Sequence, residues 1–581
     1  MNLIKLMKNL KIIDYLFILI VIGLVVLQVY LDLKLPDFTG GIMTELGKIK
    51  YGIDVDLAVI WANGGLMLAC AFGSLGSAIL VRFCTAAISA RLAYNVRAKV
   101  YNKIQGFSLA EINKFSTASL ITRTTNDITH VQTFVSMGMQ AMVKAPILAV
   151  WSVIKILNKS WQWSVAIGVA VGFLLLMVTV IVLFAVPKFK KIQTMTDDMN
   201  RITRENLTGI RVIRSANAEE YQNKKFESNN EKLTRTNLFV NKIMGIMSPG
   251  MTLLMSGLSL SIYWIGSYIV KDDSGVADMT IFMQYGMQVV MAFMLMIMLF
   301  ILLPRTLVAS KRINEVLDTK ESIVPGNYVD ENFDGKASVV FDHVAFKYPD
   351  ADEYVLKDIS FEAHEGETIA FIGSTGSGKS TLINLIPRLY DATEGEILID
   401  GVNVKDYNLE NLNKKIGYVP QRGVLFSGTV KSNIDFGDNN ADDETIKKAI
   451  SVAQASNFVS RMSDGVDSPI AQGGTNVSGG QKQRLSIARA IARKPEILIF
   501  DDSFSALDYK TDRKLRSALK KHTGSVTKFI VAQRIGTIKD ADKIIVLDSG
   551  EMVGMGTHEE LLKNCQVYQE IALSQLSKEE L

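Results

Sequence analysis

The stretch that decides the fold of this 581-residue chain's second half is Thr368-Ile-Ala-Phe-Ile372 followed by Gly373-Ser-Thr-Gly-Ser-Gly378-Lys379-Ser380. A short apolar segment, a glycine-rich loop and a following helical run (381–389) form the strand–loop–helix order that a phosphate-binding P-loop requires. The loop's backbone N–H groups would face anionic phosphates. Lys379 would reach the outer phosphates, and Ser380 would ligate Mg²⁺.

A second apolar segment, Ile497–Phe500, ends in Asp501-Asp502. We expect it to supply the other half of the site, with Asp501 holding Mg²⁺ through water and Asp502 polarising the attacking water. An apolar strand that ends in Asp is weak evidence alone and strong evidence beside a P-loop. Since Ala337–Tyr348 alternates like a half-buried strand, this half of the chain reads as an α/β domain.

Between these segments lies Val477-Ser478-Gly479-Gly480-Gln481-Lys482-Gln483-Arg484. Ser478 precedes a predicted helix, Gln481–Ala492, and is a good N-cap residue, while the two glycines permit a close approach. Such a helix start can bind a second phosphate face. It can equally be an ordinary capped helix.

The first half of the chain is much more apolar, and it raises the overall composition to 48% hydrophobic and only 21% charged residues. This excludes a disordered chain, and the net charge of +4 gives no sign of a nucleic-acid partner. Each of six segments is long enough to span a bilayer. They are Tyr15–Leu31, Leu57–Val81, Val131–Ile154, Ser160–Pro187, Ile243–Val270 and Met279–Pro304.

The distribution of Lys and Arg predicts the orientation of these segments. Two long connections, Arg82–His130 and Lys188–Lys242, are basic, whereas Lys155–Lys159 and Lys271–Asp273 are short. The long connections and both termini should therefore face the cytoplasm. We expect the long connections to be helical hairpins, with solvated loops as the alternative. Met1–Lys11 resembles a short amphipathic helix on the inner membrane surface rather than a signal peptide.

We expect a polar connector over roughly Arg305–Lys336, and we place a membrane domain at 1–320, a linker at 321–336 and a nucleotide-binding domain at 337–581. Lys144 lies inside an apolar span and should contact a ligand or ion, or else snorkel or form a structural pair. Two methionine stripes at helical spacing suit either an adaptable ligand surface or helix packing: Met244, Met247, Met251, Met255 and Met283, Met287, Met291, Met294, Met298. Cys70, Cys84 and Cys565 are interpreted as small apolar residues, since they are too scattered for a disulfide framework or a zinc site.

Residues Val477–Arg484 resemble the signature sequence of ATP-binding cassette (ABC) transporters, and the chain over about residues 10–575 resembles an ABC exporter half-transporter. The other family motifs occur in order, with Ser505-Ala506-Leu507-Asp508 matching the D-loop and Tyr418-Val419-Pro420-Gln421 the Q-loop. Leu207–Arg211 and Ala216–Glu220 resemble the second cytoplasmic loop, which docks on a nucleotide-binding domain. The resemblance implies an all-α six-helix transmembrane domain followed by an α/β P-loop domain, and two chains closing head to tail around ATP. It assigns ATP to Tyr348, Gly373, Ser374, Thr375, Gly376, Ser377, Gly378, Lys379, Ser380, Thr381, Gln421, Ser478, Gly479, Gly480, Gln481 and Asp508, and Mg²⁺ to Ser380, Gln421 and Asp501.

Two positions depart from the family pattern. Asp502 replaces the usual glutamate, so its carboxylate falls short by about 1 Å, a misplacement that can cost roughly 10²-fold in rate. Gln533 replaces the switch histidine and carries no positive charge. Because both changes affect the site on this chain's own P-loop while the signature is intact, we expect a heterodimer in which this site is degenerate. The resemblance is closest to the degenerate-site subunit of bacterial multidrug exporters, with hydrophobic compounds exported across the cytoplasmic membrane. A lipid or peptide exporter half and an ATP-gated channel or regulatory subunit are the alternatives.

Overall fold

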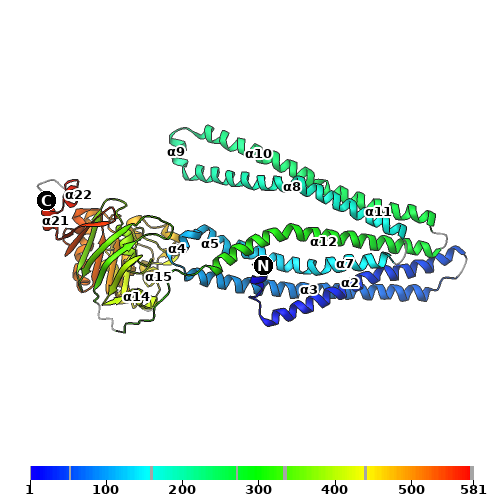
Figure 1. The fold of residues 1–581 in the computed structure, drawn as a ribbon, viewed down its shortest axis with the longest axis horizontal. Coiled ribbons are helices and arrows are strands. Elements are labelled where there is room, and N and C mark those ends of the chain that lie inside the picture. The colour runs from blue at the N-terminus through cyan, green and yellow to red at the C-terminus, as the bar shows by residue number, and fades with distance from the viewer. Residues whose placement is uncertain are drawn as a thin grey trace. The chain divides into compact units, whose positions relative to one another are not determined.

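The computed structural model describes residues 2–51, 54–157, 161–269, 273–331, 336–437 and 441–575 (Figure 1). The chain forms two compact units. One comprises Met1–Lys103 and Ile121–Thr319, and the other comprises Ile104–Leu120 and Lys320–Leu581. Parts of the predicted outer connections Lys155–Lys159 and Lys271–Asp273, and part of the predicted linker, lie outside the described residues.

The described part of the first unit is helical, and the six predicted spans are confirmed as six helical stretches long and apolar enough to cross a membrane. A helix satisfies its own backbone hydrogen bonds, as hydrocarbon requires. The helices of the six spans are α2 (Ile12–Gly47), α3 (Leu57–Gln105), α5 (Thr117–Thr124) with α6 (Asn126–Thr133) and α7 (Met139–Leu157), α8 (Trp161–Thr208), α10 (Glu219–Gly245) with α11 (Met247–Ile269), and α12 (Asp273–Asp318). Two short turns, Lys48–Tyr51 and the π-helical Phe134–Gly138, complete them.

Both long basic connections are helical, as predicted. α3 continues to Gln105, and α8 and α10 form a hairpin joined by α9 (Ile210–Ser215), visible in Figure 1. The prediction that the polar connector begins near Arg305 is wrong, because α12 runs through Pro304 to Asp318. A proline is tolerated inside a membrane helix when neighbouring groups satisfy the freed carbonyl.

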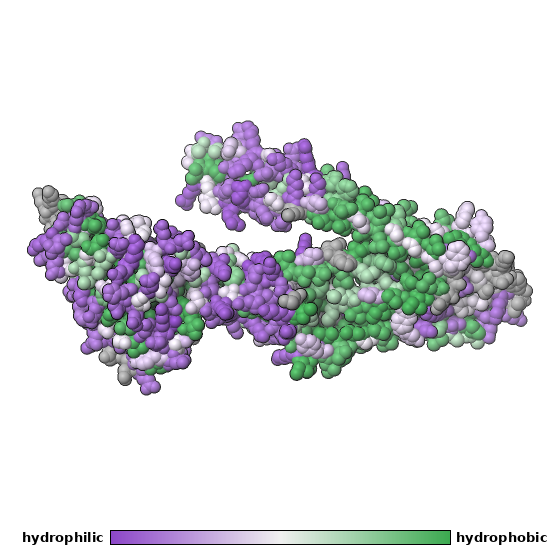
Figure 2. Space-filling view, in the orientation of Figure 1, coloured by the Kyte–Doolittle hydropathy of each residue, from purple (hydrophilic) through white to green (hydrophobic). Residues whose placement is uncertain are grey.

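The surface of the first unit matches a membrane environment. Figure 2 shows a broad apolar surface over the membrane-spanning parts and a hydrophilic surface around α9 and the adjoining part of α10. Large apolar side chains such as Phe72 and Leu176 are 69% and 62% exposed, which is unfavourable in water and favourable in lipid. The N-terminal helix α1 (Asn2–Met7) forms as predicted. However, Leu6 is fully buried and Asn314 of α12 donates a hydrogen bond to the carbonyl of Asn2 (2.9 Å), so part of its apolar face packs on protein.

The second unit contains a six-stranded sheet in the order β12-β11-β3-β10-β9-β6 and a four-stranded antiparallel sheet in the order β2-β1-β4-β5. Five strands of the larger sheet are parallel and β12 is antiparallel. The strands of the two sheets are β1 (Val339–Phe346), β2 (Leu356–Ala363), β3 (Thr368–Gly373), β4 (Glu394–Ile399), β5 (Val402–Asn403), β6 (Ile416–Val419), β9 (Ile497–Asp501), β10 (Thr527–Val531), β11 (Lys543–Asp548) and β12 (Glu551–Gly556), and β7 (Gly428–Thr429) pairs with β8 (Pro469–Ile470).

Helices cover these sheets: α4 (Leu109–Phe115), α13 (Lys379–Leu385), α14 (Leu409–Lys415), α15 (Val430–Ile434), α16 (Asp443–Val452), α17 (Ser456–Val459), α18 (Gly479–Ala492), α19 (Tyr509–His522), α20 (Ile535–Ile538), α21 (His558–Asn564) and α22 (Gln566–Leu573). α4 comes from the first basic connection, and its Leu109 packs against the apolar core of this unit. Strand β3 separates two cores, because Ile369 and Phe371 belong to one cluster and Ala370 and Ile372 to the other. This alternation follows from the period of two in a strand.

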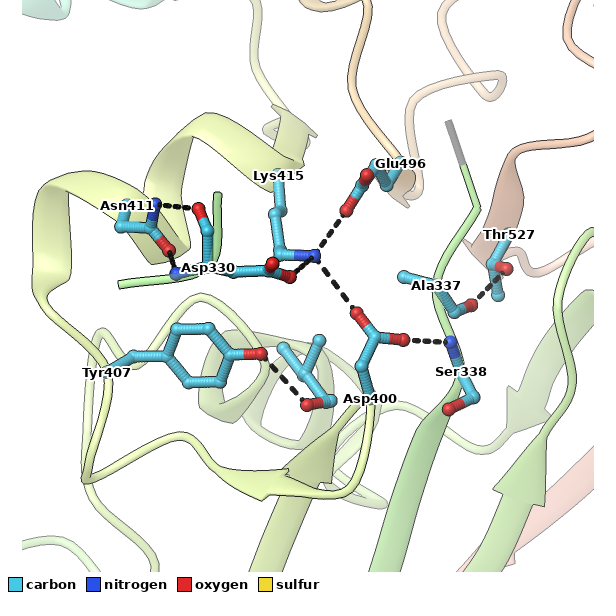
Figure 3. Close-up of polar contacts among 10 residues, drawn as sticks. Asp330, Ala337, Ser338, Asp400, Tyr407, Asn411, Lys415, Glu496 and Thr527 are labelled. Atoms are coloured by element: carbon cyan, nitrogen blue, oxygen red, sulfur yellow. Dashed lines mark hydrogen bonds and ion pairs between the residues drawn. The ribbon is translucent and has the colours of Figure 1, made fainter. Parts of the chain in front are cut away.

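A buried ion cluster fastens the connector to the second unit (Figure 3). Lys415 is 1% exposed, and its Nζ lies 2.7 Å from Asp330, 3.0 Å from Asp400 and 2.6 Å from Glu496. Burial alone would lower the pKa of Lys415, but the three carboxylates outweigh burial and raise it. Asn411 also exchanges two hydrogen bonds with the backbone of Asp330. The connector is thereby joined to β4 and β9, since Asp400 follows β4 and Glu496 precedes β9.

Candidate nucleotide-binding site

The glycine-rich loop has the predicted setting, because β3 ends at Gly373 and α13 begins at Lys379. Gly376 and Gly378 adopt φ values of 89° and 95°, a region that residues with a Cβ rarely occupy. At Gly378 a Cβ would also lie 2.7 Å from Leu356 Cδ2 and 3.0 Å from the carbonyl oxygen of Val355. The loop therefore needs glycine at position 378 for its conformation and for space.

The Lys379 ammonium is folded into its own loop. It donates hydrogen bonds to the carbonyls of Gly373 (2.9 Å) and Ser374 (2.6 Å) and lies 3.1 Å from Ser377 Oγ. Burial lowers the pKa of Lys379, and the charges of Asp502 and Asp501 partly oppose that shift. A buried ammonium that uses all three N–H groups on loop oxygens is well placed to exchange them for phosphate oxygens.

Ser380 and Asp501 converge on one point. Ser380 Oγ donates a hydrogen bond to Asp501 Oδ1 (2.7 Å), and Asp501 is 7% exposed. Burial raises the pKa of Asp501, the hydrogen bond from Ser380 opposes this shift, and the charge of Asp502 adds to it. A hydroxyl and a carboxylate are the oxygen ligands that Mg²⁺ prefers, so these two residues fit the ion. A bound cation would also relieve the unfavourable burial of the Asp501 charge.

The two atypical residues meet directly. Gln533 Nε2 donates to Asp502 Oδ2 (3.0 Å), and Gln421 Nε2 donates to the same oxygen (3.3 Å). Asp502 itself has a left-handed φ of 44°, and its N–H bonds the carbonyl of Val531 at the end of β10 (3.0 Å). Its side chain is therefore enclosed by the loops that follow β6 and β10. Of the predicted Mg²⁺ ligands, Gln421 thus bonds Asp502 rather than Asp501.

Tyr348 is joined to the loop through Thr381. The Tyr348 hydroxyl and Thr381 Oγ1 are 2.9 Å apart, and the Tyr348 ring packs edge-on against Phe346 and Tyr390. These contacts fix the aromatic ring that was assigned to the base. Tyr348, the loop 373–381, Gln421, Asp501, Asp502 and Gln533 therefore form one connected site.

The signature residues form a separate group. The predicted N-cap is confirmed, since Ser478 Oγ accepts from the N–H of Gln481 (3.4 Å) while Gln481 Oε1 accepts from the N–H of Ser478 (2.8 Å). At Gly480 a Cβ would lie 3.2 Å from the carbonyl oxygen of Ala506, a tight approach that favours glycine. Asp508 caps α19 by accepting from the N–H of Thr511 (3.0 Å). These hydrogen bonds of Ser478, Gln481 and Asp508 remain within the starts of the two helices.

Gln575, which no sequence pattern predicted, binds the loop that contains Gln533 through two hydrogen bonds. Its Nε2 donates to the carbonyl of Gln533 (2.7 Å), and its Oε1 accepts from the N–H of Ile535 (2.9 Å). Gln575 follows α22, whose Tyr568 and Ala572 are fully buried. No local pattern marks this residue, because its partners lie about forty positions earlier in the chain.

Two acidic residues of the membrane unit were also missed. Lys144 is paired with Asp32 (3.1 Å), and Lys155 is paired with Asp37 (2.7 Å). Lys144 is thus paired, as one of the alternatives predicted, and its partner is on α2. Among the methionines, Met251, Met255 and Met283 pack against the apolar core, whereas Met291 and Met298 are 52% and 47% exposed. Cys565 is buried, and Cys70 and Cys84 are half-buried.

Comparison with known proteins agrees with this fold and site. A model of the ABC transporter transmembrane region matches residues 18–293, and an ABC transporter model matches residues 356–505. An uncharacterised ABC transporter ATP-binding protein of Mycobacterium tuberculosis is 39% identical over 527 residues, covering 89% of this chain and 88% of that protein. An ATP-dependent lipid A-core flippase of Pseudomonas aeruginosa is 31% identical over 513 residues, covering 87% and 84%.

A multidrug resistance ABC transporter ATP-binding and permease protein of Lactococcus lactis is 29% identical over 569 residues, covering 97% of this chain and 94% of that protein. The solved structure of a bacterial Atm1-family ABC exporter with ATP bound has the same fold, with a TM-score of 0.77 at 24% identity and coverage of 95% and 96%. Six apolar helices followed by a P-loop domain define an ATP-driven membrane transporter. The chain belongs to the ABC transporter family, as an exporter half with fused membrane and ATP-binding parts.

Proposed function

We propose that this chain is the degenerate-site subunit of a heterodimeric ABC exporter for hydrophobic or amphipathic compounds. The observation that carries the proposal is the contact between Asp502 and Gln533, the two positions where the family usually has glutamate and histidine. A short carboxylate held by two neutral amides is poorly placed to polarise a water. The site on this chain's P-loop would then bind ATP and hydrolyse it slowly.

In the proposed subunit, different residues of this chain would bind the base, the phosphates and Mg²⁺. Tyr348 would stack on the base, residues Gly373–Thr381 would surround the phosphates, and Lys379 would transfer its N–H groups to them. Ser380 and Asp501, with Gln421 after a rearrangement, would hold Mg²⁺, which supplies charge neutralisation on the phosphates. Ser478, Gly479, Gly480 and Gln481 would complete the ATP site of the partner subunit, and Asp508 would line the contact between subunits.

The proposed arrangement has a membrane domain at 1–320, a linker at 321–336 and a nucleotide-binding domain at 337–581. Both termini and the nucleotide-binding domain would face the cytoplasm, with the helices in the cytoplasmic membrane. The Pseudomonas relative is named a lipid A-core flippase and the Lactococcus relative a multidrug transporter. These names support an amphipathic substrate for this chain, and they leave a lipid exporter as the nearest alternative.

The test compares two alanine variants in the purified complex. Ser478→Ala should reduce ATP turnover about tenfold or more, because it removes a hydrogen bond to charge at the partner's competent site. Asp502→Ala should change turnover little. Thr557→Ala is the matched control for lost helix capping, since Thr557 caps α21 in the same way. Abolished turnover in Asp502→Ala with normal turnover in Ser478→Ala would reverse the assignment.

A further inference from the structure

The two acids of α2 form ion pairs at different depths in the membrane. Lys144 precedes Lys155 by eleven residues of α7, a rise of about 16 Å, whereas Asp32 precedes Asp37 by five residues of α2, a rise of about 8 Å, so the two pairs lie at different levels along these helices. Asp32 and Lys144 remain 27% and 19% exposed. Charged groups on membrane-spanning helices are costly, and they usually face a path for substrate or ions.

The polar groups around Asp32 have unused hydrogen-bonding capacity. Ser74 Oγ donates to Asp32 Oδ1 (2.5 Å), and Gln288 Nε2 donates to the carbonyl of Asp32 (3.1 Å). Gln28 is 7% exposed and lies one helical turn before Asp32, on the same face of α2. Within the described part of the chain, the Oε1 atoms of Gln28 and Gln288 are buried and accept no hydrogen bond. Such an atom costs about 1–3 kcal/mol, which favours a role in accepting from a ligand.

The outer pair differs in this respect. Asp37 accepts from the Tyr285 hydroxyl on Oδ1 (2.7 Å) and from Lys155 on Oδ2 (2.7 Å). The Tyr285 hydroxyl also lies 3.0 Å from the carbonyl of Leu33. Both carboxylate oxygens of Asp37 thus accept a hydrogen bond from a protein side chain. The Asp37–Lys155 pair therefore provides a matched control for the Asp32–Lys144 pair.

We propose that Gln28, Asp32, Lys144 and Gln288 form a recognition site for the headgroup of a zwitterionic amphiphile with a primary ammonium and a phosphate. Lys144 uses one N–H group on Asp32 and has others for the phosphate. The two amide oxygens, together with Asp32, accept the N–H groups of the ammonium. Val29, Leu33 and Leu148, from the same stretches of α2 and α7, belong to a packed apolar cluster that holds the two helices together beside these polar groups.

This inference rests on the proposed export of amphipathic compounds, and binding can be measured without transport. All five tryptophans lie between residues 61 and 264, and Trp151 of α7 contacts Tyr30 of α2 (ring centroids 5.8 Å). Tryptophan fluorescence of the full chain in maltoside micelles would follow titration with lysophosphatidylethanolamine. Lysophosphatidylcholine, an alkylammonium and an alkyl phosphate of the same chain length would each lack part of the recognised headgroup.

Lysophosphatidylethanolamine should bind most tightly, and Gln28→Met, Asp32→Asn and Lys144→Met should each weaken it about tenfold or more, the loss expected from about 1.4 kcal/mol. Asp37→Asn should not change its affinity. Gln28→Met separates ligand binding from structure, because removing an unpartnered buried amide should leave the melting temperature unchanged or higher.

Equal affinity for all four amphiphiles, or normal affinity in Gln28→Met, would overturn the inference. Substrate-stimulated ATPase activity of the complex distinguishes the two proposals. If other hydrophobic compounds stimulate the ATPase activity and the four amphiphiles show no preference for lysophosphatidylethanolamine, the proposed export stands and the proposed headgroup site is wrong. If lysophosphatidylethanolamine binds preferentially but no compound is transported in proteoliposomes, the headgroup site stands and the proposed export is wrong.

Discussion

Asp502 accepts hydrogen bonds from two side-chain amides on one oxygen atom. A glutamate at this position would extend the carboxylate by one methylene, and a histidine at position 533 would bring a cation that an amide cannot supply. Both replacements are single-residue changes, one at the buried Asp502 and one at the exposed Gln533. The functional state of the site therefore depends on two side chains rather than on the backbone around them.

We predict that Asp502→Glu combined with Gln533→His raises hydrolysis at this chain's own site by up to about 10²-fold, because the carboxylate regains its reach. The measurement is ATP turnover of the complex in a Ser478→Ala background, where the partner's site is weakened. Asp502→Asn with Gln533→His is the control and should remain slow. Unchanged turnover in the Glu/His variant would mean that another feature limits this site.

Lys528 provides a pH-dependent prediction. It lies on β10, is 6% exposed, and burial lowers its pKa to about 8. An unfolded lysine titrates near 10.4, so the folded state binds fewer protons between these values and stability rises with pH from about 8 to about 10. Lys528→Met should flatten that rise in a calorimetric scan. A wild-type unfolding temperature that falls steadily from pH 8 to pH 10, with the same fall in Lys528→Met, would contradict the assignment.

At the scale of elements, the Lys415 cluster holds the connector, α14, β4 and β9 together. Lys415→Met should lower the free energy of unfolding by about 3–5 kcal/mol, because it leaves three carboxylates close together without their cation. Thermal unfolding of the full chain would measure the loss. The neighbouring Lys414 is exposed and pairs with the exposed Glu410, so Lys414→Met should cost less than about 1 kcal/mol. Equal losses in the two variants would contradict the role of burial.

Elements could be predicted from the sequence where neighbouring residues encode them. The P-loop, β9 and the Ser478 cap were predicted correctly because each is encoded within about ten consecutive residues. The prediction that the sixth span gives way to the connector after Pro304 was wrong, because a proline is a weaker stop signal in a membrane helix than in a helix in water. Asp330, Glu496 and Gln575 were missed because their roles arise only when distant segments pack together.

At the scale of the whole molecule, one short segment joins the end of α12 to the second unit. α12 ends at Asp318, and the carbonyl of Val324 already accepts a hydrogen bond from Arg388 (3.0 Å). The backbone of Gly326 then bonds Tyr407, and a Cβ on Gly326 would lie 2.0 Å from the carbonyl oxygen of Asp406. Six residues span at most about 20 Å, which limits how far this segment can extend.

We predict that inserting four Gly/Ser residues after Thr319 uncouples ATP hydrolysis from transport, because the added chain can lengthen by roughly 14 Å. Basal ATP turnover should persist in the complex, while uptake into inverted vesicles should fall. The control replaces Thr319 and Lys320 by Gly and Ser and changes flexibility without length. Normal transport by the insertion variant would show that this segment carries no mechanical load.

Strand β3 has dry, tightly packed side chains on both faces, with Ile369 and Phe371 on one and Ala370 and Ile372 on the other. The glycine-rich loop begins where this immobilised strand ends, and Lys379 already holds three oxygen atoms of that loop. Little conformational entropy is therefore left to lose when a nucleotide arrives. ATP should associate with a loop that is already formed, so that the affinity of this chain for nucleotide does not depend on the rate at which it hydrolyses ATP.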